Sequence, residues 1–177
     1  MSTLNILLAG FGGQGILFLG KMAAYSGLMD NKQITWLPSY GPEMSGGTAN
    51  CSVCISDDLI GSPLVINPDI LVAMNLPSLE KFIDKVVPGG TVLVDCSIID
   101  RKVHREDINV FYVPATRLAT DNGLPGLANM IMLGKMFKET GFCTECALEE
   151  ALSACVPPRK AEMMELNRKA LKIGSEL

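Results

Sequence analysis

The stretch Leu7-Leu8-Ala9-Gly10-Phe11-Gly12-Gly13-Gln14-Gly15-Ile16-Leu17 predicts a buried strand, a glycine turn and the start of a helix. The apolar run that begins at Leu4 supplies the strand, and helical spacing of apolar residues begins after Gln14. Its glycines fit the pattern G-x-G-x-x-G of dinucleotide-binding turns. Backbone N–H groups of such a turn converge beside the positive end of the helix dipole, so an anion can bind there.

One partner of a nicotinamide or flavin dinucleotide site is missing from this sequence. Such sites usually have an Asp or Glu at the end of the second strand, where it binds the ribose. The second predicted strand, Gln33 to Leu37, continues into Pro38 and Ser39 without a carboxylate. Two interpretations therefore stay open: an anion-binding turn, or glycines that only allow a helix to pack tightly on a strand.

The composition indicates a globular chain and excludes several classes of function. At 177 residues and 48% hydrophobic residues, residues 1–177 are expected to form a single domain with a substantial core. The net charge of −4 argues against non-specific nucleic-acid binding. We see neither a signal peptide nor an apolar run long enough to span a membrane. Six cysteines without a secretion signal favour reduced thiols and a cytoplasmic location.

Strands and helices are expected to alternate through the first two thirds of the chain. This order predicts an α/β fold: a three-layer, Rossmann-like, mostly parallel sheet with helices on both faces and a helical C-terminal third. Besides those already given, the strands are expected at 48–57, 70–74, 91–94 and 109–113, and the helices at 14–29, 77–86, 127–138, 145–154 and from 158 on.

The segment from Pro38 to Gly47 is predicted to be a long loop, because two prolines and three glycines cannot continue a strand or helix. Loops of this length in compact α/β proteins are often functional. The strand that follows, Thr48 to Asp57, alternates apolar and polar residues. This alternation favours an antiparallel or edge strand with one wetter face.

The candidate groups for catalysis or metal binding are few. His104 lies in a charged, solvated stretch, and no nucleophile elbow, zinc motif or carboxylate pair stands out. Cys51 and Cys54 form one C-x-x-C pair, but three positions apart in a strand they point to opposite faces and cannot bind one metal ion. Cys143 and Cys146 straddle a predicted helix start, where a redox pair is conceivable. The plainer interpretation is that these cysteines are small buried residues, and we expect no catalytic residue and no metal site.

Two motifs resemble the gamma subunit of 2-oxoacid:ferredoxin oxidoreductases. The first is Gly10-Phe11-Gly12-Gly13-Gln14-Gly15, and the second is Ser39-Tyr40-Gly41-Pro42-Glu43-Met44-Ser45-Gly46-Gly47-Thr48. The family form of the second is Y-G-P-E-x-R-G-G-x, and Ser45 stands where Arg is common. The resemblance extends over about residues 3 to 175 through Ile60-Gly61-Ser62-Pro63, Ala73-Met74-Asn75 and Pro88-Gly89-Gly90.

The resemblance implies a subunit of a complex that oxidatively decarboxylates a 2-oxoacid to an acyl-CoA and reduces ferredoxin. The complex would use thiamine diphosphate, Mg, iron–sulfur clusters and coenzyme A, with no cofactor bound tightly by this chain. Its partners would be alpha and beta (thiamine-binding) subunits, a ferredoxin-like delta subunit and ferredoxin, with no nucleic acid or membrane. The isolated chain would be inactive and is expected to self-associate.

The resemblance also assigns roles to residues. Gly12, Gly13, Gln14 and Gly15 would form the turn, with Asn75, on the coenzyme A side. The loop that faces the partner subunit and active site would comprise Tyr40, Gly41, Pro42, Glu43, Gly46, Gly47 and Thr48. The compact form of this loop is most similar to 2-oxoglutarate or branched-chain types, although pyruvate and indolepyruvate enzymes leave the substrate open. The alternative is a stand-alone dinucleotide- or coenzyme A-binding Rossmann-like protein.

Overall fold

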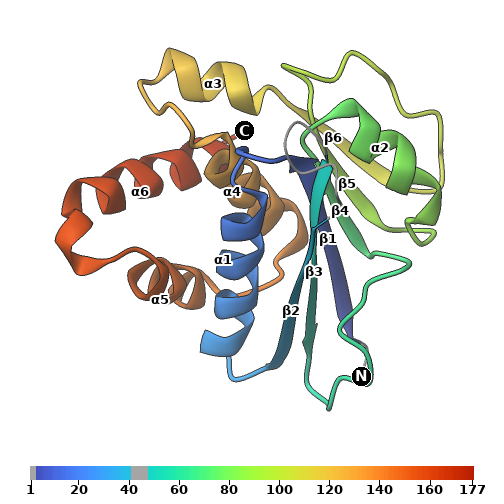
Figure 1. Cartoon of the computed structure of the whole chain (residues 1–177), viewed down its shortest axis with the longest axis horizontal. Helices are drawn as coiled ribbons and strands as arrows, with labels where there is room; N and C mark the ends of the chain where they lie inside the picture. The colour runs from blue at the N-terminus through green and yellow to red at the C-terminus, as the bar shows by residue number, and fades with distance from the viewer. Residues whose placement is uncertain (1–2, 41–47) are drawn as a thin grey trace.

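A six-stranded sheet forms the centre of the molecule, as the computed structural model shows for residues 3–40 and 48–177 (Figure 1). The strands lie in the order β2-β3-β1-β4-β5-β6. Strand β3 runs antiparallel to both of its neighbours, and the pairs β1–β4, β4–β5 and β5–β6 are parallel. Their bounds are β1 Leu4–Phe11, β2 Gln33–Tyr40, β3 Thr48–Ser56, β4 Ile70–Ala73, β5 Thr91–Asp95 and β6 Asn109–Val113.

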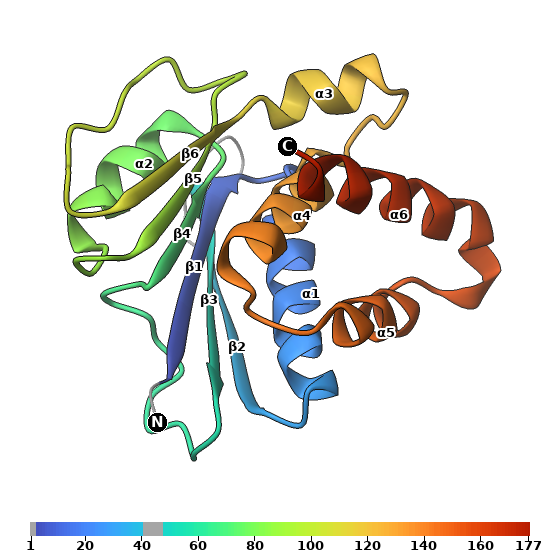
Figure 2. The same cartoon turned by 180° about the vertical axis from the view of Figure 1, so that it is seen from behind.

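Helices cover both faces of this sheet, and Figures 1 and 2 show the three layers from opposite sides. One face carries α1, α4, α5 and α6, the other carries α2 with a short 3-10 turn, and α3 lies beyond the carboxyl ends of the parallel strands. The bounds are α1 Ile16–Met29, α2 Leu76–Phe82, α3 Ala115–Asp121, α4 Ala128–Thr140, α5 Glu145–Cys155 and α6 Ala161–Ser175, with 3-10 turns at Ile83–Lys85 and Pro158–Lys160. The predicted α/β class, mostly parallel sheet and helical last third are confirmed.

Four expectations need correction. The loop expected from Pro38 starts later, because Pro38, Ser39 and Tyr40 still pair with β3 and extend β2 to Tyr40. Helix α3 has no counterpart among the predicted helices, because it is short and follows Pro114 without a side-chain cap. The helix expected from Pro77 to Val86 ends at Phe82 and continues as a 3-10 turn. Strand β3 is antiparallel as expected but has no wetter face: Ser52 and Cys54 are buried, since the segment 57–69 crosses over them.

Two hydrophobic cores flank the sheet. The larger lies under α1, α4, α5 and α6, and the smaller under α2 and the segments 57–69 and 96–108. Helix α1 lies close on the sheet because two of its glycines face it. A Cβ added at Gly20 would lie 2.4 Å from the Cys51 sulfur, and one added at Gly27 would lie 2.9 Å from Ile34.

Helices α4 and α6 cross at two glycines. A Cβ added at Gly134 would lie 2.1 Å from the carbonyl oxygen of Leu171, and one at Gly174 would lie 1.9 Å from that of Ile131. The two backbones touch, so α6 is docked on α4 without intervening side chains.

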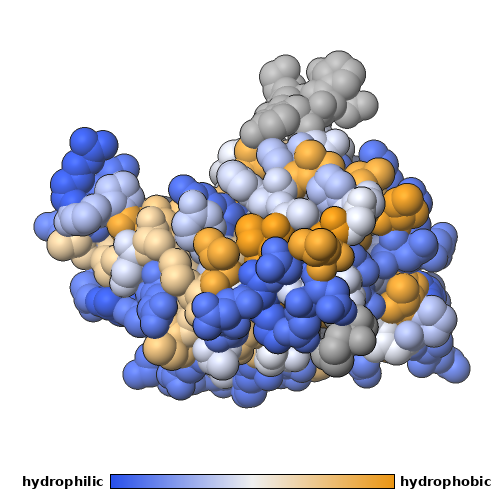
Figure 3. All heavy atoms as spheres, turned by 90° about the horizontal axis from the view of Figure 1, so that it is seen from below, coloured by the Kyte–Doolittle hydropathy of each residue, from blue (hydrophilic) through white to orange (hydrophobic). Residues whose placement is uncertain are grey.

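Seen from below, hydrophobic side chains gather in a broken band across the middle of the surface (Figure 3). In the described ranges, no helix is both long and apolar enough to cross a membrane.

Candidate functional site

A crevice opens at the carboxyl edge of the sheet, where β1 and β4 lie side by side and parallel. After β1 the chain turns into α1 on one face, and after β4 it turns into α2 on the other. Ligands of open α/β sheets bind at such a switch point. The crevice has a volume of about 190 Å³ and is lined by Gly13, Gln14, Met74, Ile98, Thr116, Ala119, Thr120, Gly126 and Ala128. None of these lining residues is charged.

The glycine turn forms one wall and requires glycine at two positions. Gly13 (φ 95°) and Gly15 (φ 75°) both have left-handed backbones that other residues rarely adopt. Gly13 is exposed, and a Cβ added there would meet no atom within 4 Å, so the turn leaves open space for an incoming group. Gly15 begins α1 with no side-chain cap, and a Cβ there would lie 2.3 Å from the Asn129 amide nitrogen. Gly15 therefore fits the tight-packing interpretation, and anion binding at Gly13 stays a prediction.

Gln14 holds the turn against the neighbouring strand. Its Oε1 accepts a hydrogen bond from the Phe11 N–H at 2.6 Å, and its Nε2 donates to the Met74 carbonyl at 2.9 Å. The side chain passes over Gly10, where a Cβ would lie 2.5 Å from Gln14 Oε1. Gln14 therefore links the ends of β1 and β4, and its amide is already hydrogen-bonded at both ends.

Asn75 follows β4 and is fully buried. Its Oδ1 accepts from the Ser78 N–H at 2.9 Å and caps α2, while its Nδ2 has no hydrogen-bond partner in the structure. The neighbouring Met74, rather than Asn75, lines the crevice. The structure therefore places the Asn75 side chain behind the crevice wall.

The opposite wall belongs to α3, which Asp95 anchors to the sheet. Asp95 is fully buried at the end of β5 and accepts hydrogen bonds from the Thr116 hydroxyl (2.6 Å) and the Ser97 N–H (3.1 Å). Thr120, one turn further along α3, is exposed and lines the crevice. Sequence inspection missed Thr116, Thr120 and Gly126, and the only signal available was the polar residue Asp95 at the end of an apolar strand.

The predicted partner loop falls largely outside the described residues. This applies to Gly41, Pro42, Glu43, Gly46 and Gly47. The residues at its two ends are placed by the sheet register. Thr48 pairs with Phe11, and Tyr40 pairs with Ala49. The loop therefore leaves and re-enters the sheet beside the glycine turn, so the two motifs of the sequence meet at one edge.

The cysteines are all free thiols. Cys51 and Cys54 belong to the two different cores, which confirms that they point to opposite faces. Burial raises the pKa of Cys51 and of Cys143 to about 12. A hydrogen bond to Glu150 raises the pKa of the exposed Cys146, so this helix start does not favour a thiolate. Within residues 3–40 and 48–177, no three His, Cys, Asp or Glu side chains come together in a possible metal site.

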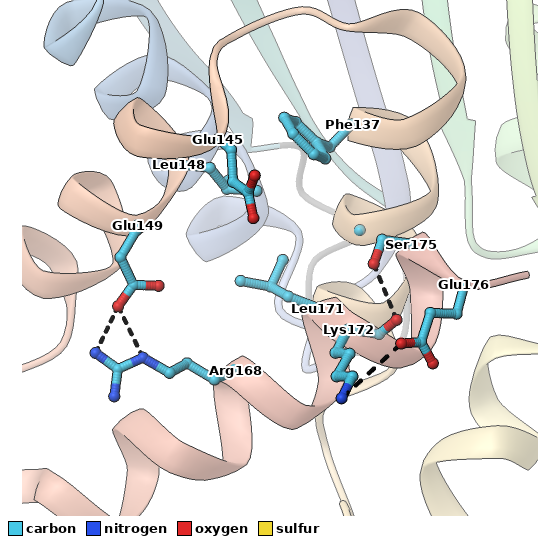
Figure 4. A pocket seen from close by; sticks show the side chains of 10 residues that line it. Phe137, Glu145, Leu148, Glu149, Arg168, Leu171, Lys172, Ser175 and Glu176 are labelled. Carbon is cyan, nitrogen blue, oxygen red and sulfur yellow. Dashed lines mark hydrogen bonds and ion pairs between the residues drawn. The ribbon is translucent and has the colours of Figure 1, made fainter.

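A larger cavity, of about 500 Å³, lies elsewhere, between α4, α5 and α6 (Figure 4). Phe137, Leu148 and Leu171 form its apolar part. Four of its charged side chains form two ion pairs, Arg168 with Glu149 and Lys172 with Glu176, whereas Glu145 has no side-chain partner among the described residues. Its lining residues come from α4, α5, α6 and Glu176, and none comes from the end of a strand, so the smaller crevice is the better candidate.

Comparison with known proteins identifies the class to which this chain belongs. Residues 5–177 match the family model described as pyruvate ferredoxin/flavodoxin oxidoreductase. The chain therefore belongs to the pyruvate ferredoxin/flavodoxin oxidoreductase family, as the two motifs suggested.

Particular relatives are subunits of such enzymes. The chain is 40% identical over 159 residues to 2-oxoglutarate synthase subunit KorC of Methanocaldococcus jannaschii, covering 86% of this chain and 83% of KorC. It is 37% identical over 174 residues to ketoisovalerate oxidoreductase subunit VorA of Methanothermobacter thermautotrophicus, covering 97% of this chain. It spans about a third of VorA, 36% of its length.

Solved structures confirm the fold. The gamma subunit of a keto/oxoacid ferredoxin oxidoreductase from Geobacter sulfurreducens matches with a TM-score of 0.84 and 30% identity, over 98% of this chain and 96% of that one. A 2-oxoglutarate:ferredoxin oxidoreductase from Magnetococcus marinus matches with a TM-score of 0.88 and 24% identity, over 99% of this chain and 31% of that one.

Proposed function

We propose that this chain is the gamma subunit of a multisubunit 2-oxoacid:ferredoxin oxidoreductase, which converts a 2-oxoacid to an acyl-CoA and reduces ferredoxin. The observation that carries the proposal is the family match over residues 5–177, together with near full-length similarity to KorC and to a solved gamma subunit. The relatives point to 2-oxoglutarate or ketoisovalerate as the 2-oxoacid.

The proposed partners are those of the family. In the part of the chain that the structure describes, no three His, Cys, Asp or Glu side chains come together, and the crevice is lined by uncharged residues. Thiamine diphosphate with Mg and the iron–sulfur clusters would then belong to alpha, beta and delta-type subunits, as in the family. Such a complex would work in the cytoplasm, where free thiols persist. On its own the chain would be inactive.

We assign the crevice to coenzyme A, which is a substrate of the reaction. The relative from Magnetococcus marinus was solved with 2-oxoglutarate, coenzyme A and succinyl-CoA bound. Here the open space over Gly13 and the backbone of the turn at Gly12 and Gly15 suit a phosphate approaching the start of α1. Gln14 and Asn75 would act by holding this turn and the start of α2 in place.

The size of the crevice indicates that a partner completes the site. Its volume of about 190 Å³ is below the roughly 300–1,000 Å³ of most small-molecule sites. The segment from Tyr40 to Thr48, which contains Glu43, starts and ends at the sheet edge beside this crevice and is the part of the chain that we propose faces the partner subunit. Coenzyme A would then lie between this chain and the thiamine-binding subunit.

The second candidate, a stand-alone dinucleotide-binding protein, is disfavoured by the sheet order. Strand β4, not the second strand of the chain, lies beside β1 on its parallel side. It leads into Met74 and the buried Asn75, so no carboxylate stands where a ribose would be bound.

Co-purification tests the assignment. A tagged copy of the chain, expressed from its native locus, should isolate a thiamine-binding subunit and a ferredoxin-like subunit in fixed ratio. Recovery of the tagged chain without them would contradict the proposal.

A variant of Thr120 tests the coenzyme A crevice separately. Thr120→Trp should fill the crevice from the exposed face of α3 and raise the KM for coenzyme A at least about tenfold, with the KM for the 2-oxoacid unchanged. Thr120→Ser, which keeps the hydroxyl, is the control. An unchanged KM for coenzyme A in the Trp variant would remove the crevice from the site.

A further inference from the structure

Strand β2 is an edge of the sheet. It pairs with β3 on one side and is the outermost strand in the order. Its substantial contacts in the described residues are with β3 and α1, and Figures 1 and 2 both show the outer side of β2 without another strand beside it. An edge strand presents unpaired N–H and C=O groups that can pair with a strand of another chain.

The direction of these groups follows from the registers. The backbone carbonyls of Asn5 and Ala9 accept hydrogen bonds from the N–H groups of Asp69 and Met74, which lie at the two ends of β4. The backbone N–H and C=O groups of odd-numbered β1 residues therefore point toward β4, and those of even-numbered residues point toward β3. In an antiparallel ladder, residues that point at each other form the hydrogen-bonded pairs. Leu8 and Cys51 are such a pair, so Ser52 points the other way, toward Leu37 of β2.

The outward row of β2 is therefore the even-numbered one. Thr35 and Leu37 bond to β3, whereas the backbone groups of Ile34, Trp36 and Pro38 point away from the sheet. Pro38 has no N–H, but its backbone nitrogen lies on the outward side, so no hydrogen bond to β3 is lost. An edge strand tolerates proline at such an outward position. The edge thus offers the backbone N–H groups of Ile34 and Trp36, which have no partner within residues 3–40 and 48–177.

This edge exposes large apolar side chains and carries no charge. Trp36 is 39% exposed on the α1 face, and Leu37 is 37% exposed on the opposite face. From Gln33 to Tyr40 the strand contains no Lys, Arg, Asp or Glu, which are the residues that commonly protect edges from pairing. Lys32, just before the strand, is neutralised by an ion pair with Asp57.

We propose that β2 pairs antiparallel with β2 of a second copy of this chain, about a two-fold axis at Trp36, so that the two sheets become continuous. In this register the two Trp36 residues lie opposite each other, and the N–H of each donates to the carbonyl of the other. Ile34 lies opposite Pro38 of the other copy, and the Ile34 N–H donates to the Pro38 carbonyl. Because Pro38 has no N–H, the Ile34 carbonyl is left without a donor. The pattern is self-complementary, as a two-fold interface requires.

A second copy fits this edge better than a charged partner. Each copy carries a net charge of −4, so two copies repel each other, and acidic groups at the contact surface would add to this repulsion. The edge from Gln33 to Tyr40 contains no acidic residue and adds no local repulsion. Pairing also brings the two exposed Trp36 side chains together on the α1 face, where aromatic cross-strand pairs are favourable.

A charge-swap experiment tests the register. The wild-type chain should sediment as a dimer that dissociates on dilution, and Trp36→Phe should behave alike. Trp36→Glu and Trp36→Lys should each weaken dimerisation by about thirtyfold or more, because like charges then face each other across the axis. An equimolar mixture of these two variants should recover a mixed dimer. Monomeric wild type, dimeric charge variants, or a mixture that stays monomeric would overturn the proposal.

Hydrogen exchange on the wild-type chain gives a second readout that needs no variant. The Trp36 amide should become protected as protein concentration rises, whereas the Thr35 amide, which bonds to β3, should be protected at every concentration. Fast exchange at Trp36 in the concentrated protein would contradict the pairing, even if another surface produced a dimer. Neither experiment involves coenzyme A or the crevice, so their failure would leave the proposed function standing.

Discussion

Gln14→Ala tests whether the glutamine of the glycine motif holds the turn or binds the ligand. The change removes the acceptor of the Phe11 N–H and the donor to the Met74 carbonyl. A neutral intramolecular hydrogen bond contributes about 0.5–1.5 kcal/mol net, so the pair contributes about 1–3 kcal/mol to the free energy of unfolding. For a chain of this size, about 2 kcal/mol corresponds to a loss of about 4–8 °C in Tm.

The assay is urea and thermal unfolding of the full chain, followed by circular dichroism. Gln33→Ala is the matched control, because Gln33 is an exposed glutamine at the start of the edge strand. Its free energy of unfolding should change by no more than about 0.5 kcal/mol. If Gln14→Ala leaves Tm unchanged and abolishes coenzyme A dependence in the assembled enzyme, Gln14 contacts the ligand and our interpretation is wrong.

Two further predictions concern packing and thiol chemistry. Gly134→Ala should lower the free energy of unfolding by about 1–3 kcal/mol or more, because its Cβ would lie 2.1 Å from the Leu171 carbonyl, whereas Gly61→Ala has open space and should be nearly neutral in the same urea titration. Glu150 raises the pKa of the exposed Cys146 thiol, so Glu150→Gln should lower this pKa. Alkylation of Cys146 should then be faster at a fixed pH below the pKa. An unchanged alkylation rate across a pH series would show that Glu150 does not control the pKa of Cys146.

Much of the fold could be predicted from local sequence. The glycine turn between an apolar run and a helical pattern located β1 and α1, and apolar runs bounded by turn residues located β4, β5 and β6. The alternation in β3 indicated an antiparallel strand, but its polar positions suggested exposure. Ser52 is buried because its hydroxyl accepts the Val65 N–H, and this contact with a distant loop has no local signature.

The candidate site was predicted only in part. The motif located the glycine turn, because the need for glycine in a tight turn is set by the local backbone conformation. The far wall was missed, because α3 reaches the crevice through the long-range bond between Asp95 and Thr116. The proximity of the two motifs also depends on register, since the pairing of Phe11 with Thr48 brings together segments that lie far apart in the sequence.

The most direct test of the proposed role is the rate of 2-oxoacid-dependent viologen reduction by the purified partner subunits, with coenzyme A and thiamine diphosphate, in the presence and absence of this chain. The proposed role predicts no turnover by the chain alone, little or none by the partners alone, and full turnover when they are combined. Turnover by the isolated chain, or an unchanged rate when the chain is omitted, would contradict it.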